Sequence, residues 1–68
     1  MNEIIFSVEE SDEGGYIAKA LGYSIITQAE TIVELKAMVT DAVKCHFESS
    51  QLPKIVRLHF VREEVFAV

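Results

Sequence analysis

The stretch DEGGYIAKALGYSIITQAETIVEL, residues 12–35, decides the fold. Its start belongs to a turn at residues 11–15 (SDEGG), where two adjacent glycines tolerate positive φ at little cost. Residues 3–9 (EIIFSVE) before this turn alternate between two faces, and residues 16–21 after it resume a strand pattern. Two strand patterns joined by such a turn predict a β-hairpin.

A third short strand is expected directly after the hairpin. Gly22 interrupts the second strand pattern, and residues 24–29 are rich in β-branched side chains. Because so few residues separate this run from the one before it, we expect the next strand of a meander.

The same stretch ends in the start of a helix. Thr31 and Glu34 form a T-x-x-E capping box, in which the Thr31 hydroxyl accepts from the Glu34 amide and the Glu34 carboxylate reaches back to the Thr31 amide. The helix is predicted to begin at Ile32 and to end in the segment that leads to Pro53. A 3.6-residue period places its apolar stripe on one face, formed by Ile32, Leu35, Val39, Ala42, Val43, His46 and Phe47.

The last part of the chain returns to strand patterns. Residues 54–61 (KIVRLHFV) alternate, and residues 62–64 are expected to turn the chain into a short terminal strand at residues 65–68. The helical segment is long enough to bring residues 54–61 back parallel to an earlier strand. The predicted fold class is α+β, with the order β-β-β-α-β and one helix packed on a small mixed sheet, in a single domain at residues 1–68.

One face of this sheet has no helix to cover it. Ile5, Ile17 and Ile55 or their alternates are expected on that face, and a domain of this size has only a thin core. The terminal run at residues 65–68 is apolar as well. We therefore expect a homo-oligomer.

Composition narrows the classes of partner and compartment. The 68 residues carry a formal net charge of −5 with only six Lys and Arg, which argues against direct nucleic-acid binding and favours a basic protein partner. The one cysteine cannot form an internal disulfide, and no signal-peptide pattern opens the chain, so a cytoplasmic location is expected. No apolar run approaches the length of a membrane span.

The order of these motifs resembles the HicB-like antitoxin family. The segments EESDEGGYIAKALG and TQAETIVELKAMVTDAVKCHFE follow its pattern of an acidic D-x-G-G-Y turn, a strand, a Gly-containing loop and a Thr-capped helix. The resemblance covers roughly residues 3–61. The matching positions are Asp12, Gly14, Gly15, Tyr16, Ala18, Gly22, Thr27, Thr31, Glu34, Leu35 and Ala42. The loop at residues 21–24 lacks the Pro and Cys that are common in the family, and Ala29 stands where Gly is frequent.

The resemblance implies a partial ribonuclease-H-like fold without its catalytic carboxylates. It also implies a non-catalytic antitoxin that covers the active surface of a small, basic, RNA-cleaving toxin. No helix-turn-helix or ribbon-helix-helix pattern follows residue 61, so operator binding is not expected. The residues that we expect to meet the Lys and Arg side chains of a toxin are Glu9, Glu10, Asp12 and Glu13, with Tyr16 beside them. The alternative reading of these carboxylates is a solvated turn.

Other chemistry-bearing residues form no recognisable catalytic or metal motif. Cys45 and His46 are adjacent, so on a helix they point about 100° apart and chelate one ion poorly. His59 has no nucleophile beside it, and Asp41 on the polar helix face does not converge with Asp12 or Glu9. We expect no cofactor, no metal and no enzymatic activity. Two alternatives stay open: a small metal-dependent hydrolase on the same scaffold, and an orphan family member that only self-associates.

Overall fold

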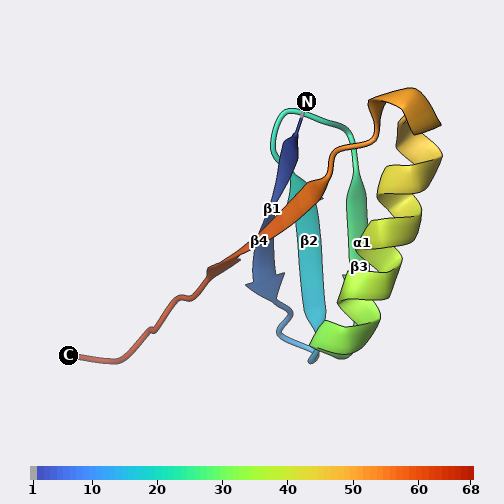
Figure 1. Ribbon diagram of the computed structural model, residues 1–68. Coiled ribbons are helices and arrows are strands. Elements are labelled where there is room, and N and C mark those ends of the chain that lie inside the picture. Colours follow the sequence, from blue (N-terminus) through green and yellow to red (C-terminus); the bar gives the residue numbers. More distant parts are fainter. Residues whose placement is uncertain (1) are drawn as a thin grey trace.

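The computed structural model describes residues 2–68 and contains one four-stranded sheet with one helix packed on it (Figure 1). Strands β1 and β2 form a hairpin, β2 and β3 pair antiparallel, and β4 returns parallel to β1. The sheet order is β3-β2-β1-β4, which confirms the predicted α+β class and the β-β-β-α-β order. The elements are β1 (Glu3–Glu10), β2 (Tyr16–Ala20), β3 (Ile26–Ala29), α1 (Ile32–His46), the short 3-10 helix η1 (Ser49–Gln51) and β4 (Ile55–Val61).

The turn between β1 and β2 depends on its glycines. The Ser11 amide donates to the Gly15 carbonyl and the Gly14 amide donates to the Ser11 carbonyl, both at 3.0 Å. Gly14 and Gly15 have φ of 95° and 84°, a region that side chains rarely adopt. A Cβ on Gly15 would also lie 2.8 Å from the Ala29 carbonyl oxygen. Gly15 therefore allows the hairpin to approach the end of β3 closely.

The second and third strands are shorter than predicted. β2 ends at Ala20 rather than residue 21, and β3 begins at Ile26 rather than residue 24. Gly22, with φ of 83°, turns the chain between them, and the Ala20 amide donates to the Ile25 carbonyl at 2.9 Å. Ile25 is thus outside β3, yet its side chain is buried in the core.

The helix begins at Ile32, as predicted, with Thr31 as its N-cap. The Thr31 hydroxyl accepts from the Glu34 amide at 3.1 Å. The other half of the predicted capping box is wrong, because the Glu34 carboxylate accepts from the Glu30 amide, at 3.3 Å, rather than from Thr31. A Glu side chain is long enough to reach this amide, one residue before the cap. Two side chains therefore still accept from backbone amides at the start of α1: the Thr31 hydroxyl from the Glu34 amide and the Glu34 carboxylate from the Glu30 amide.

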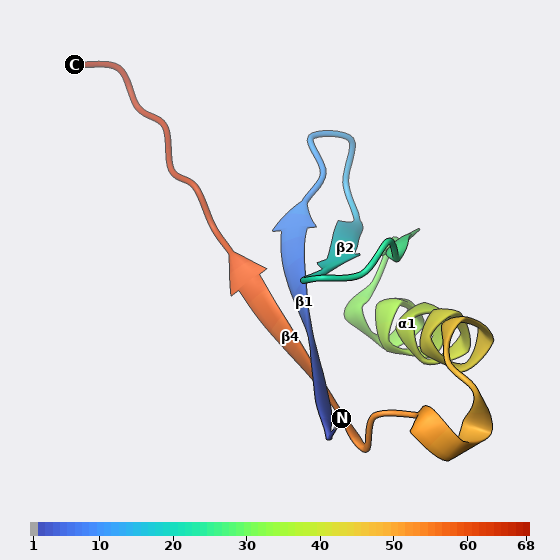
Figure 2. The same cartoon turned by 90° about the horizontal axis from the view of Figure 1, so that it is seen from above.

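The core lies between α1 and the central strands. It contains eight buried apolar residues: Ile4, Phe6, Val8, Ala18, Ile25, Leu35, Val39 and Val43. The buried stripe of α1 is narrower than predicted, because Ile32 is 39% exposed and His46 is exposed. The helix lies over β3 and β2 and away from β4 (Figure 2).

This offset leaves the helix-facing side of β4 partly uncovered. Val56, Leu58 and Phe60 pair with Ile4, Phe6 and Val8 of β1 in the parallel register. The β1 residues are buried, whereas Val56 and Phe60 are 37% and 47% exposed. A hollow of about 230 Å³ remains between α1 and β4, lined by Lys36, Val39, Thr40, Val56 and Leu58.

The predicted terminal strand at residues 65–68 is wrong. After Val61 the chain continues as an extended segment without strand pairing, and residues 62–64 do not reverse it. The physical reason is that β1, the neighbour of β4, leaves the sheet after Glu10, so no strand of the described chain lies beside residues 62–68. We call this segment, residues 62–68, the tail.

The α-helix α1 has 15 residues. No helix in the described part of the chain has both the length and the apolar character needed to span a bilayer.

Candidate partner-binding surface

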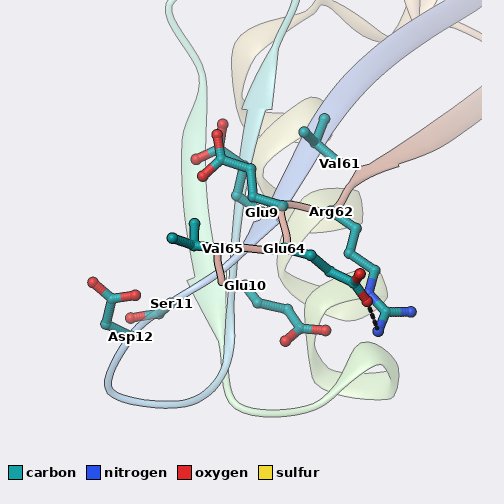
Figure 3. Close-up of a pocket in the computed structure, with 9 residues that line it drawn as sticks. Glu9, Glu10, Ser11, Asp12, Val61, Arg62, Glu64 and Val65 are labelled. Carbon is teal, nitrogen blue, oxygen red and sulfur yellow. Dashed lines mark hydrogen bonds and ion pairs between the residues drawn. The ribbon is translucent and has the colours of Figure 1, made fainter. Parts of the chain in front are cut away.

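An acidic hollow of about 540 Å³ lies where β1 and β4 end (Figure 3). Its walls come from the end of β1, the following turn, the end of β4 and the start of the tail. The residues that line it are Glu9, Glu10, Ser11, Asp12, Val61, Arg62, Glu63, Glu64 and Val65. We call this site the acidic hollow.

The parallel register of β1 and β4 brings these segments together. Glu9 lies opposite Val61, so both strands end at the same edge of the sheet. The chain then turns into the hairpin after Glu10, whereas the tail continues outward from Val61. Because acidic residues lie at the end of β1, in the turn and in the tail, the space between these segments is lined by carboxylates.

The acidic hollow holds more negative than positive charge. It is lined by five carboxylates, and Arg62 is the one cationic residue among its lining residues. The Arg62 guanidinium lies 3.1 Å from the Glu64 carboxylate, and both side chains are largely exposed. Exposed pairs of this kind contribute little to stability. The described lining of the acidic hollow therefore carries a net negative charge.

The structure brings together three of the five residues that the sequence suggested for partner binding. Glu9, Glu10 and Asp12 line the acidic hollow. Glu13 is exposed in the turn, where its amide donates to the Ser11 hydroxyl at 3.3 Å, and it is not among the lining residues.

Tyr16, the fifth of these residues, lies at the start of β2 and is half-buried. Its ring packs edge-on against Phe60, with 6.2 Å between the ring centroids. Tyr16 therefore packs beside the core rather than lining the acidic hollow.

Glu63 and Glu64 are the acidic residues that sequence reasoning missed. They lie more than fifty positions from Glu9 along the chain but share a hollow with it. The signal that identifies them is the parallel register, since Val61 opposite Glu9 places the residues after each strand at one edge. This register cannot be read from the alternation of either strand alone.

The remaining chemistry-bearing residues do not converge. Cys45 and His46 are exposed at the end of α1, where the His46 ring packs against the rings of Tyr23 and Phe47 at 5.9 and 4.9 Å. Asp41 is exposed on α1, and His59 is exposed on β4. Within residues 2–68, no group of three or more His, Cys, Asp and Glu side chains is placed to share a metal ion.

An ion pair lies on the sheet face away from the helix. The Arg57 guanidinium donates through Nε to the carboxylate of Glu3. This hydrogen bond lowers the pKa of Glu3 below its ordinary value, and the attraction between the two charges adds to the effect. The same bond raises the pKa of Arg57. The pair therefore adds a side-chain contact between β4 and β1 to the pairing of these two parallel strands.

The chain is similar to two proteins named UPF0150 protein. One, from Archaeoglobus fulgidus, is 60% identical over 52 residues, which cover 76% of this chain and 77% of the relative. The other, from Thermotoga maritima, is 50% identical over 66 residues, which cover 97% of this chain and 93% of the relative. The chain belongs to the UPF0150 family. The UPF0150 name itself states no activity, substrate or partner.

No family model matches this UPF0150 chain, and no solved structure matches it either. The family membership therefore rests on the two relatives.

Proposed function

We propose that this UPF0150 chain is an antitoxin-like binding module that neutralises a small basic RNA-cleaving toxin by covering its active surface. The resemblance to HicB-like antitoxins, carried by the acidic Gly-Gly-Tyr turn and the Thr-capped helix, supports this proposal. The proposed mechanism is occlusion in the cytoplasm, without catalysis by the chain itself.

The observation that carries the proposal is the acidic hollow. A toxin that binds RNA needs Lys and Arg to contact phosphates, so its active surface is positively charged. Five carboxylates around one hollow offer that surface an alternative set of anions. Charge complementarity of this kind mainly raises the rate of association and selects the partner.

The test uses the protein encoded next to this chain in its native host, which the proposal expects to be small and basic. That protein is purified and its cleavage of RNA is measured while the UPF0150 chain is added in increasing amounts. We expect cleavage to stop when the two proteins reach a fixed molar ratio. Cleavage that continues at a large excess of the chain, or a neighbouring protein that does not cleave RNA, would contradict the proposal.

A matched pair of variants tests the site. Asp12→Lys reverses a charge in the acidic hollow, whereas Asp41→Lys reverses an exposed charge on α1 outside it. We expect Asp12→Lys to weaken neutralisation at least tenfold and Asp41→Lys to leave it unchanged. Equal effects of the two variants would assign the interaction to overall charge and not to the hollow.

A second candidate function is an orphan family member that only self-associates. The partly exposed apolar side chains of β4 and of the tail favour this candidate. The hydrolase alternative has no comparable support, since it needs carboxylates that hold a metal ion. Within residues 2–68, no three His, Cys, Asp or Glu side chains are placed to hold one, the carboxylates of the acidic hollow included.

A further inference from the structure

β4 is an uncovered edge of the sheet. It is the last strand in the order β3-β2-β1-β4, it is seven residues long, and its outer side has no partner strand in the described chain. The helix does not protect it, since Val56 and Phe60 are partly exposed on the helix-facing side. Long apolar edges of this kind pair with other strands unless they are covered.

The tail continues this edge away from the body of the protein (Figures 1 and 2). Val65 and Phe66 are 92% and 83% exposed, and Val68 is fully exposed. Apolar side chains on an extended segment lose most of their exposed area only when another surface lies against them.

The tail does not fold back on its own strand. A tight hairpin needs residues with positive φ, usually Gly or Asn, at its centre. Residues 62–64 are Arg, Glu and Glu, and no non-glycine residue in the described range has positive φ. Within residues 2–68, no strand therefore covers the outer side of β4.

We propose that two copies of this chain pair antiparallel through β4 and the tail, with the two-fold axis at Glu63. The two four-stranded sheets then join into one continuous sheet. This proposal does not rest on toxin binding, but residues 61–65 belong both to the interface and to the lining of the acidic hollow. A two-fold axis suits the geometry, because identical strands that pair antiparallel form a closed, self-complementary interface.

The alternation of side chains supports this register. Side chains at even-numbered positions of β4 face the helix side, so an extended tail places Phe66 and Val68 on that same side. With the axis at Glu63, Phe60 lies opposite the partner's Phe66, and Leu58 lies opposite the partner's Val68. Aromatic and aliphatic cross-strand pairs of this kind stabilise antiparallel sheets.

The same register also pairs the remaining tail residues. Arg62 lies opposite the partner's Glu64, so the ion pair that these residues form within one chain becomes a pair between chains. On the other face, Val61 lies opposite the partner's Val65. Only Glu63 meets its own copy, which places two like charges at the axis.

Neighbouring registers pair the residues less well. An axis at Arg62 places two guanidinium groups opposite each other and sets Phe60 against the partner's Glu64. An axis at Glu64 sets Phe66 against the partner's Arg62. A shift of the axis by one residue moves every pair by two positions. Each of these two registers keeps some apolar pairs, Leu58 with the partner's Phe66 in the first and Phe60 with the partner's Val68 in the second, but sets one aromatic ring against a charged group.

The oligomeric state tests the interface. Sedimentation velocity is measured from micromolar to millimolar concentration for the unmodified chain, Val65→Asp and Val33→Asp. Val33 is 80% exposed on α1, outside the proposed interface, so the control makes the same chemical change at a similarly exposed site. We expect dimers for the unmodified chain and for Val33→Asp, and a dissociation constant at least tenfold higher for Val65→Asp. A monomer throughout, or equal behaviour of the two variants, would overturn the proposal.

A cross-linking experiment tests the register. In a Cys45→Ser background, Glu63→Cys places two thiols at the axis, where directly opposed Cα atoms lie roughly 4.5–5.5 Å apart, within disulfide range. His59→Cys is the control, since the proposed register separates its two copies by eight positions, or roughly 26 Å. We expect mild oxidation to give a covalent dimer for Glu63→Cys alone. Cross-linking of His59→Cys, or none for Glu63→Cys, would overturn the register.

Discussion

Replacing Thr31 with Ala tests whether the N-cap determines where the helix leaves the meander. The substitution removes the hydroxyl that accepts from the Glu34 amide at 3.1 Å and leaves that amide to water. Loss of such a cap costs about 1 kcal/mol, within a range of roughly 0.5–2 kcal/mol. In a domain of this size, about 1 kcal/mol lowers the thermal midpoint by roughly 4–8 °C.

The matched control for this prediction is Thr40→Ala in the same helix. Thr40 is exposed, and its hydroxyl donates to the Lys36 carbonyl at 2.7 Å. Both residues lie inside α1, so this hydrogen bond does not cap an end of the helix. Because Ala has the higher helix propensity, we expect Thr40→Ala to leave the midpoint unchanged or to raise it slightly. Thr31→Ser keeps the hydroxyl and should remain close to the unmodified chain.

The assay is thermal unfolding followed by far-ultraviolet circular dichroism at one fixed protein concentration. The concentration is fixed because self-association makes the midpoint concentration-dependent. A midpoint for Thr31→Ala that equals that of Thr40→Ala would refute the reasoning. The position of α1 would then follow from the packing of Leu35 and Val39 on the sheet rather than from its cap.

Three further predictions follow from particular contacts. Gly15→Ala should lower the thermal midpoint more than Gly14→Ala, because both glycines have positive φ but only a Cβ on Gly15 meets the Ala29 carbonyl oxygen; equal losses would assign the cost to φ alone. The pKa of Glu3 is lower in the folded chain than in the unfolded chain, so the pair with Arg57 stabilises the fold at pH values above the unfolded-state pKa of Glu3. This contribution to stability is lost as the pH falls through the folded-state pKa of Glu3. Arg57→Gln should therefore raise the pKa of Glu3 in an NMR titration of the carboxyl carbon, and an unchanged pKa would contradict the assignment. The purified chain should cleave neither RNA nor phosphodiester model substrates with Mg²⁺ or Mn²⁺, and turnover abolished by Asp41→Asn or Asp12→Asn would favour the hydrolase instead.

Local chemistry made the helix start and the hairpin predictable. A Thr followed three residues later by Glu marks an N-terminus because the groups that satisfy each other are close in sequence. Adjacent glycines mark the turn for a similar reason, since the required positive φ belongs to the residue itself. Such features do not depend on what packs against them.

The acidic hollow and the unpaired tail could not be predicted from local sequence patterns. Glu63 and Glu64 join Glu9 only because β4 is parallel to β1 with Val61 opposite Glu9. The tail satisfies the strand pattern but has no neighbouring strand in the described chain, and a strand needs a partner.

The acidic hollow is the surface that we propose to attract a basic partner. The most direct test is the association rate between this chain and the protein encoded beside it in the native host, which the proposal expects to be basic, measured by stopped flow at low and high salt. We predict a rate that falls as salt is added, that drops at least tenfold at low salt for Asp12→Lys, and that is unchanged for Asp41→Lys. An association rate that is independent of salt and equal in the two variants would contradict the account.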